Sequence, residues 1–328
     1  MNAIDVHAHW YPKRVLELVA RYGPAYGVEW TEVESTGPQF RIGHLLTGPL
    51  GPRFVDLDAR LRAMDEQGVA VQALSFSQPM VDWAPPELAE RLAATFNEEL
   101  CAAHAHARTR LVGLAALPMC TPSIAAREVD RVAKLPGIRG IYLSTHVNGR
   151  DLSHEAFLPV FERIQDLGLP VFLHPVFVIG HERLQQYYLT NLLGNPFESA
   201  IAAAHLVFGG VLDRFPTLEV VLPHAGGAFP WLIGRLSRGW KKRADLKRIK
   251  HSPQQYLRRF HYDTIGYSGA LLEHLARMVG PDRILMGSDY CFPIAYERPV
   301  EVVADNPALQ ETDKRAILEL NAKRLLRL

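Results

Sequence analysis

Short apolar runs alternate with longer amphipathic stretches along the whole chain. Most of the runs are nearly continuous and rich in leucine or β-branched residues, as expected for strands that are buried on both faces. The amphipathic stretches, such as LDARLRAMDEQG and SIAAREVDRVAKL, end near glycine or proline, which are common helix stops. The candidate strands cover residues 3–6, 69–75, 111–117, 140–144, 170–173, 218–222, 260–264 and 283–286.

Strands in strict alternation with helices predict an α/β protein with a closed parallel barrel, the (β/α)8 or TIM barrel. A flat doubly wound sheet is the alternative, but it would have to accommodate the same strict alternation. The length of 328 residues would suit two ordinary domains, yet α/β barrels often reach this length as one domain. We therefore expect residues 1–328 to form a single barrel domain.

Two segments interrupt the alternation. Residues 10–55 are rich in glycine, proline and aromatic residues and follow the first strand, and residues 175–198 lengthen the connection after the fifth. Both follow the carboxyl ends of strands, where barrels keep their active sites. We expect residues 10–55 to form a small insertion that caps the pocket, not an independent domain.

The first strand ends in the sequence Asp5-Val-His7-Ala-His9. Residues two apart on a strand point to the same face, so both imidazoles can reach into the mouth of the barrel and bind one ion. Two histidines this close can also be ordinary surface residues. Asp5 shares their face and could orient one of the imidazoles.

Three further strands end in potential metal ligands: His174 in VFLHP, His224 in VVLPHAGG and Asp289 in ILMGSDY. A single histidine after a strand is usually structural, but several such strand ends that meet at one barrel mouth indicate a metal site. Three neutral imidazoles and one carboxylate suit Zn2+, with Mn2+ or Fe2+ as other possible occupants.

His224 can be interpreted in two ways, as a further ligand or as a free base close to the substrate. The other histidines and Asp289 already make an adequate ligand set, and a histidine with a near-neutral pKa suits proton transfer. Gly226 and Gly227 after it allow the backbone to approach a bound ligand closely. These features favour the base.

The composition excludes several classes of protein. A hydrophobic content of 48% and a charged content of 22% are typical of a globular chain, and a net charge of +1 does not favour nucleic acid or a charged membrane surface. No signal peptide or membrane-spanning stretch is recognisable. Three widely spaced cysteines without a CxxC motif argue against disulfides and indicate a reducing cytoplasm.

Taken together, these motifs resemble the amidohydrolase superfamily, and more narrowly its aminocarboxymuconate-semialdehyde decarboxylase branch. The similarity runs over essentially the whole chain, from IDVHAHWYP and RLRAMDEQGVAVQALS to ILMGSDYCFP, and the segment FGGVLDRFPTLEVVLPHAGGAFPWLIGRL is its most specific part. The resemblance implies a barrel with one zinc ion and with His224 as the catalytic base. The ligands that it implies are His7, His9, His174 and Asp289.

The resemblance also has consequences for the substrate. It implies a homodimer in which an arginine of the GRL segment, here Arg235, holds the substrate carboxylate in the neighbouring subunit's site. The family's namesake enzyme has a second substrate arginine in the insertion, where this chain has His44, with Arg41 nearby. The chain also differs at Val176, where the family usually has tryptophan, and at Cys291, where it has proline. We therefore expect a different unsaturated or aromatic carboxylic acid as the substrate.

The predicted reaction is metal-dependent, non-oxidative decarboxylation of an aromatic or muconate-semialdehyde-type acid, as in aromatic catabolism. Loss of CO2 from an sp2 carbon first requires rehybridisation of that carbon, and His224 would activate the metal-bound water or hydroxide. Asp289 would be both ligand and catalytic group. A hydrolase of an amide, lactone or C–C bond could use the same site, and a barrel that binds without turnover is a further alternative.

Overall fold

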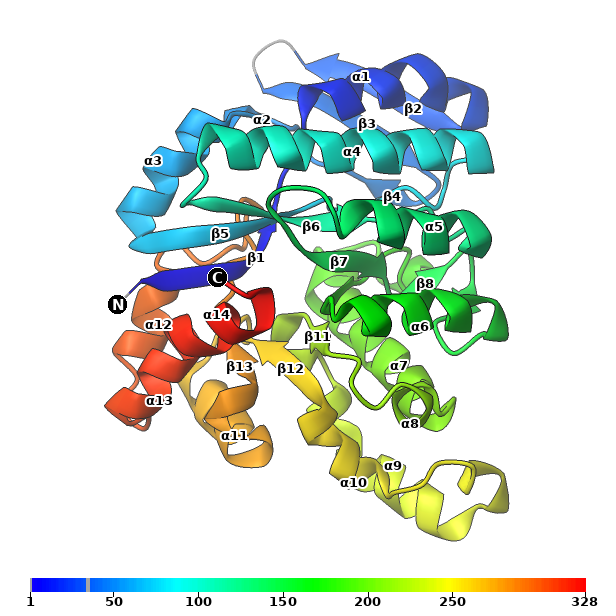
Figure 1. Ribbon diagram of the computed structural model, residues 1–328, viewed down its shortest axis with the longest axis vertical. Helices are drawn as coiled ribbons and strands as arrows, with labels where there is room; N and C mark the ends of the chain where they lie inside the picture. The colour runs from blue at the N-terminus through cyan, green and yellow to red at the C-terminus, as the bar shows by residue number, and fades with distance from the viewer. Residues whose placement is uncertain (1, 34–35) are drawn as a thin grey trace.

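The computed structural model describes residues 2–33 and 36–328, and its centre is a parallel sheet (Figure 1). All eight predicted strands are confirmed. The first reaches His9, and the last is short because the chain leaves the sheet after Leu285. In sheet order the strands are β1 (Ala3–His9), β5 (Val69–Ser75), β6 (Leu111–Ala116), β7 (Ile138–Ser144), β10 (Val171–His174), β11 (Val220–Leu222), β12 (Phe260–Asp263) and β13 (Ile284–Leu285).

The first and last strands meet and close the sheet. The main-chain N–H of Val6 donates to the carbonyl of Met286 at 3.0 Å, and that of Asp289 donates to the carbonyl of His7 at 2.9 Å. Further along, Ala8 and Tyr290 form a parallel bridge. These contacts exclude the flat doubly wound sheet and confirm the predicted (β/α)8 barrel.

Helices surround the barrel, and the sequence sets their ends. The carboxylate of Asp56 caps α3 by accepting the main-chain N–H groups of Asp58 and Ala59, and Gly68 ends this helix in the left-handed conformation with φ of 71°. None of the helices in the two described ranges is both long and apolar enough to cross a membrane. The longer helices after the insertion are α3 (Leu57–Gln67), α4 (Pro86–His106), α5 (Pro122–Val132), α6 (Leu158–Leu167), α7 (Asn195–Phe208), α9 (Phe229–Lys242) and α11 (Gly269–Val279), and the shorter ones are α8 (Val211–Arg214), α10 (Pro253–Tyr256), α12 (Pro299–Ala304), α13 (Glu311–Arg315) and α14 (Asn321–Leu326).

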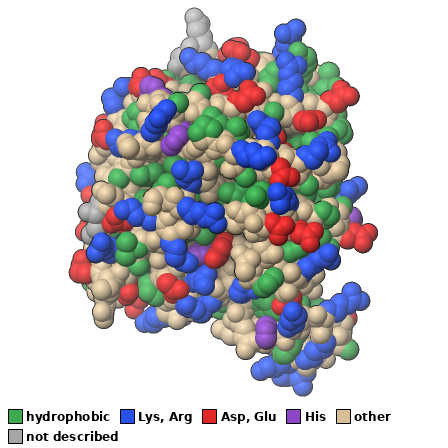
Figure 2. Space-filling view, in the orientation of Figure 1, with side chains coloured by type: hydrophobic (Ala, Val, Ile, Leu, Met, Phe, Trp, Pro, Cys, Tyr) green, Lys and Arg blue, Asp and Glu red, His purple; other side chains and the backbone are tan. Residues whose placement is uncertain are grey.

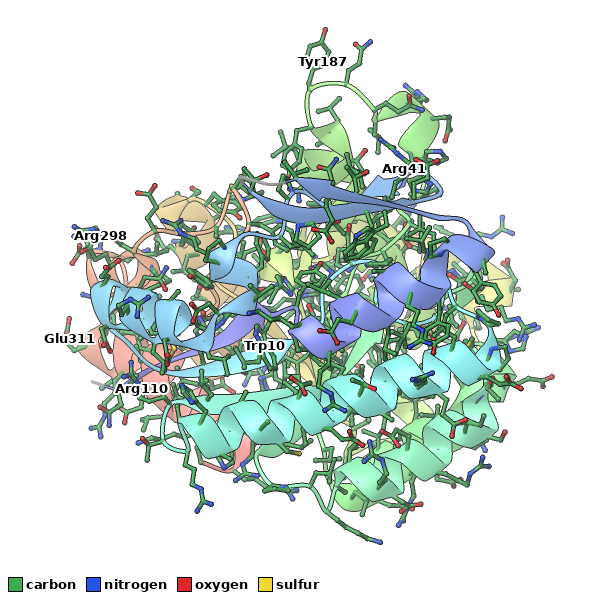
Figure 3. All side chains as sticks on the ribbon, turned by 90° about the horizontal axis from the view of Figure 1, so that it is seen from above. Trp10, Arg41, Arg110, Tyr187, Arg298 and Glu311 are labelled. Atoms are coloured by element: carbon green, nitrogen blue, oxygen red, sulfur yellow. The ribbon has the colours of Figure 1, made fainter. Side chains whose placement is uncertain are left out.

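The insertion after β1 packs on the barrel. It contains α1 (Lys13–Tyr22), the antiparallel strands β2 (Val28–Val33), β3 (Gly37–Ile42) and β4 (Leu45–Leu46), and α2 (Pro52–Val55). Its buried side chains, such as Val28 and Phe40, belong to the same apolar core as the helices around the barrel. Figure 3 shows β3, marked by Arg41, below the connection that carries Tyr187. The insertion therefore shares a core with the barrel, and its role as a cap stays a prediction.

Candidate metal centre and active site

Four side chains from three strand ends converge at the barrel mouth. One ligand atom from each of His7, His9, His174 and Asp289 lies within 4.8 Å of the other three, and all four residues are buried. The Nε2 atoms of His7 and His9 are 3.1 Å apart, and Asp289 Oδ1 is 3.2 Å from Nε2 of His9. The strands β1, β10 and β13 are far apart in sequence, so barrel closure assembles this group.

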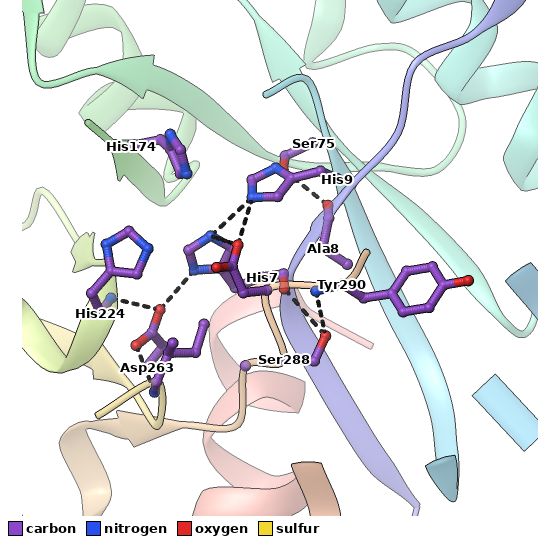
Figure 4. Close-up of polar contacts among 12 residues, drawn as sticks. His7, Ala8, His9, Ser75, His174, His224, Asp263, Ser288 and Tyr290 are labelled. Carbon is purple, nitrogen blue, oxygen red and sulfur yellow. Dashed lines mark hydrogen bonds and ion pairs between the residues drawn. The ribbon is translucent and has the colours of Figure 1, made fainter. Parts of the chain in front are cut away.

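The other ring nitrogen of each of the three histidines has an acceptor, which fixes the tautomer, and Figure 4 shows the contact of His7 with Asp263. Nδ1 of His7 donates to Asp263 Oδ2 at 2.7 Å, and Nδ1 of His174 donates to the carbonyl of its neighbour Pro175 at 3.0 Å. A carboxylate and a carbonyl can only accept, so both rings carry a proton on Nδ1, and in the neutral form of each ring Nε2 keeps a free lone pair.

His9 reaches the same tautomer through Ser75. The Ser75 hydroxyl donates to the carbonyl of Ala8 at 3.0 Å, so it accepts from Nδ1 of His9 at 3.1 Å. The Nε2 lone pairs of three imidazoles and a carboxylate oxygen are therefore directed to one small region. Outer hydrogen bonds of this kind hold metal-binding histidines in place, and the four residues fit a divalent cation.

The electrostatic environment keeps two of the imidazoles neutral. Burial lowers the pKa of His9 and of His174 well below the usual value, which preserves the neutral form that a ligand needs. Burial alone would also lower the pKa of His7, but the hydrogen bond and the charge of Asp263 outweigh it and raise this pKa. Burial raises the pKa of Asp289, because a carboxylate is costly to bury without a nearby cation.

His224 lies beside the four donors without being one of them. Its ring centre is 5.3 Å from that of His7 and 5.8 Å from that of His174, and its buried Nδ1 has no hydrogen-bond partner among residues 2–33 and 36–328. The residue has a φ of 55°, a strained conformation for a non-glycine residue that often occurs at functional sites. Burial lowers the pKa of His224, so the imidazole is available as a neutral base.

Asp263, at the end of β12, is a site residue that the sequence analysis missed. Its carboxylate accepts the proton of His7 Nδ1 and also the main-chain N–H groups of His224 at 3.0 Å and Ala225 at 2.7 Å. Its position in the sequence could have identified it, because Asp263 ends a buried strand in the same way that Asp289 follows the last strand. Asp263 therefore fixes a proposed ligand and the proposed base together.

Asp5 has a different role from the one considered above. Its carboxylate accepts the Ser288 hydroxyl at 2.6 Å, the Gln72 side-chain amide at 2.8 Å and the main-chain N–H of His7 at 3.1 Å. These bonds hold the backbone of β1 against the segment that leads to Asp289. The structure therefore assigns the orientation of an imidazole to Asp263, and the alignment of two strand ends to Asp5.

The predicted substrate-binding residues Arg41 and Arg235 are exposed, whereas the four donors are buried. Arg41 is 44% exposed, with its Nε 3.5 Å from Glu29 Oε2, and Arg235 is exposed on α9. The end of α9 and the segment after it protrude from the molecule and carry exposed lysines and arginines (Figure 2). Within the described ranges, neither arginine hydrogen-bonds to a donor residue.

His44 links the two loops that interrupt the regular alternation. Its ring stacks on that of His181, with ring centres 3.7 Å apart, and meets the edge of Phe177 at 5.5 Å. His44 Nε2 is buried, and no described residue forms a hydrogen bond with it. Val176 is buried at the barrel interior, and the Cys291 thiol lies 3.2 Å from the carbonyl of Arg53.

Comparison with known protein families decides the identity of the chain. The family model described as amidohydrolase matches residues 4–328. The chain belongs to the amidohydrolase family. This amidohydrolase is 32% identical to the 2-amino-3-carboxymuconate-6-semialdehyde decarboxylase of Dictyostelium discoideum, over 98% of this chain and 91% of that protein.

Two solved structures support the same assignment. The 5-carboxyvanillate decarboxylase LigW of Sphingomonas paucimobilis has a TM-score of 0.85 and 27% identity, covering 100% of this chain and 99% of that one. A dihydroxybenzoic acid decarboxylase of Polaromonas sp. JS666, with bound manganese and the inhibitor 2-nitroresorcinol, has a TM-score of 0.81 and 25% identity, covering 100% and 98%. The predicted class, a metal-dependent carboxy-lyase of the amidohydrolase family, is confirmed, whereas zinc as the particular metal stays a prediction.

Proposed function

We propose that this enzyme removes CO2 from an aromatic or muconate-type carboxylic acid at one divalent cation held by His7, His9, His174 and Asp289. The observation that carries the proposal is the set of fixed tautomers, which directs three Nε2 lone pairs and one carboxylate oxygen to a common point. Zinc suits this donor set, and manganese and iron(II) are the alternatives. The decarboxylases similar to this chain support the reaction class.

In the reaction, the bond between the carboxyl carbon and the sp2 carbon breaks, its electron pair stays on that carbon, and a proton takes the place of CO2. A bound divalent cation would stabilise negative charge on substrate oxygens and acidify water. His224 moves the proton, because burial favours its neutral imidazole, its buried Nδ1 has no partner in the described part of the chain, and it lies beside the four donors. Asp263 holds the main chain of His224, and Asp289 is the second group at the site that can hold a proton.

The carboxylate of the substrate also needs a cation. We assign this role to Arg235 of a second subunit in a homodimer, because Arg235 is exposed on α9 and forms no ion pair within the described ranges. Residues 10–55 would cap the site, with His44 and Arg41 at its edge. The three cysteines are free, which supports a reducing compartment such as the cytoplasm.

The test is product analysis with the protein loaded with zinc or with manganese. We expect stoichiometric CO2 release from an aromatic acid, with one solvent proton incorporated at the vacated carbon. Incorporation of solvent oxygen into the product without CO2 release would instead identify a hydrolase of an amide, lactone or C–C bond. Sedimentation of the intact protein, combined with Arg235→Ala, tests the dimer, since a monomer with full activity would exclude the role of Arg235.

A further inference from the structure

The insertion and the connection after β10 touch each other through two histidines. His44 lies in the insertion between β3 and β4, and His181 lies in the loop that carries Tyr187 (Figure 3). The two imidazoles stack face to face, with ring centres 3.7 Å apart and planes 12° from parallel. Phe177 meets the edge of the His44 ring at 5.5 Å, so the contact is a small packed unit between two segments that are far apart in sequence.

Residues 179–194 form a compact loop that hydrogen bonds hold at its start and in its interior. The main-chain N–H of Ile179 donates to Glu198 Oε2 at 2.9 Å, and that of Thr190 donates to the carbonyl of Leu184 at 3.0 Å. Surface loops of about 6 to 16 residues that are packed by their own side chains are frequently functional. The stack of His181 on His44 is therefore able to position the loop as a unit.

The loop also borders the space beside the proposed base. Asn191 and Leu192 line a cavity of about 240 Å3 whose walls include His224. A displacement of the loop away from the insertion would change the shape of this cavity and its access to solvent. The contact that positions the loop therefore controls access to the site.

The charge state of the two stacked rings decides whether they attract or repel each other. Neutral imidazoles stack without repulsion, whereas two imidazolium ions about 4 Å apart repel each other strongly in a partly dehydrated contact. Glu182 Oε2 lies 3.6 Å from His181 Nδ1 and can offset one positive charge. His44 forms no ion pair in the part of the chain that the structure describes, and its Nε2 is buried. The closed contact therefore tolerates a proton on His181 and disfavours a second one on His44.

The pKa of His44 follows from this environment. Burial, and after it the charge of His181, lowers the pKa of His44 below the usual histidine value. Opening of the loop would expose His44 to water and remove the neighbouring charge, so the open form binds the proton more tightly than the closed form. A fall in pH through the range where histidine titrates therefore shifts the equilibrium toward the open form.

The other charged groups around the contact do not supply the missing negative charge. On the insertion, Arg41 adds a cation, and its Nε lies 3.5 Å from Glu29 Oε2. On the loop, Arg183 is exposed and is also a cation. At the base of the loop, the carboxylate of Glu198 accepts a main-chain N–H, and His146 donates to a main-chain carbonyl at 3.3 Å. Among the described residues, the two stacked rings thus share one adjacent carboxylate.

We propose that His44 and His181 form an acid-sensitive latch, which holds loop 179–194 against the insertion at neutral pH and releases it when both imidazoles are protonated. The cavity beside His224 is then covered by the loop at neutral pH and more accessible in acid. The latch goes beyond the proposed decarboxylation, because it acts on access to the site whichever reaction the metal centre performs.

Limited digestion with trypsin tests the latch, because the loop contains a single trypsin site, Arg183. The manganese-loaded protein is digested briefly at pH 7.5 and at pH 5.5, and the fragments are quantified by mass spectrometry. Cleavage at the exposed lysines and arginines of residues 241–250 is the internal standard, which cancels the effect of pH on the protease. The ratio of loop cleavage to standard cleavage should rise by about three- to tenfold at pH 5.5, since an exposed imidazole with a pKa of about 6.5 gains most of a proton over this interval. An unchanged ratio would overturn the proposal.

Two variants separate the latch from other effects of acid. His44→Phe and His181→Phe each keep a ring in the stack and remove one of the two protons, so the ratio should stay level between the two pH values. His106→Phe is the matched control, because His106 lies on the outer helix α4, and this variant should keep the rise. A full rise in either latch variant would overturn the proposal and assign the effect to other groups, among them the metal ligands. If one latch variant does not fold, the other provides the comparison.

Discussion

His7 donates a hydrogen bond from Nδ1 to the carboxylate of Asp263 at 2.7 Å, and the same carboxylate accepts the main-chain N–H of His224 at 3.0 Å. One side chain thus sets the tautomer of a proposed metal ligand and the position of the proposed base. This arrangement makes Asp263 as important for the site as the donors themselves.

Asp263→Asn should weaken metal binding by about 10- to 100-fold, the usual effect of losing such an outer hydrogen bond. The amide either places its N–H group against Nδ1 of His7 or leaves that proton with a weaker acceptor. Manganese titration of the metal-free protein measures the change. Asp282→Asn is the control, because Asp282 is exposed and pairs with Arg258. Unchanged affinity in Asp263→Asn would show that His7 is held by other contacts.

His224→Ala should lower kcat by about 100- to 10,000-fold, the range expected for a lost general base, while the bound metal stays at one per chain. Metal content by mass spectrometry and CO2 release together measure both effects. His106→Ala is a suitable control, since His106 lies on the outer helix α4 and contacts Asp58. Loss of the metal in His224→Ala would instead make His224 a ligand, the alternative that the sequence left open.

Arg60→Met should destabilise the fold by about 3 kcal/mol, because it removes the positive charge from the buried network that links Arg60 through Gln72 to the Asp5 carboxylate. Arg60 is fully buried and donates to Gln72 Oε1 at 2.7 Å, and Gln72 in turn donates to Asp5. Urea unfolding measures the loss, with exposed Arg62→Met as the control on the same helix. The double variant with Asp5→Asn should lose less stability than the sum of the two single variants, and strict additivity would contradict the coupling.

Asp82 should make the protein less stable as the pH rises. Burial raises the pKa of Asp82 from 3.8 to about 6, so the native state binds more protons than the unfolded state between these values. The free energy of unfolding therefore falls as pH rises through that window and stays low above it.

Asp82→Asn should remove this dependence and stabilise the protein at pH 7 by up to about 3 kcal/mol, with no gain at pH 3.5. The amide oxygen can still accept from the main chain of Cys120, and the amide N–H can reach the Ser144 hydroxyl. Urea unfolding across pH 3.5 to 8 provides the measurement, with exposed Asp305→Asn as the control. A gain of the same size at every pH would mean that the titration of Asp82 is not its source.

The sequence alone located the barrel and the four side chains that we propose as metal ligands. Strands buried on both faces appear as continuous apolar runs, so residues 69–75 and 111–117 could be located without tertiary information. The two-residue period of a strand places His7 and His9 on one face, and the carboxyl ends of parallel strands meet at one mouth, which brings His174 and Asp289 to them.

Only the tertiary structure decided which groups surround those donors. Asp263 and His7 are 256 positions apart, and no local pattern predicts their hydrogen bond, because it depends on the register of strands around the closed barrel. The same holds for the space beside His224, because its lining residues Pro196, Trp231 and Tyr267 come from separate segments that meet only in the folded chain. Periodicity reports which face a residue occupies, whereas hydrogen-bond partners and cavity walls are set by distances that arise on folding.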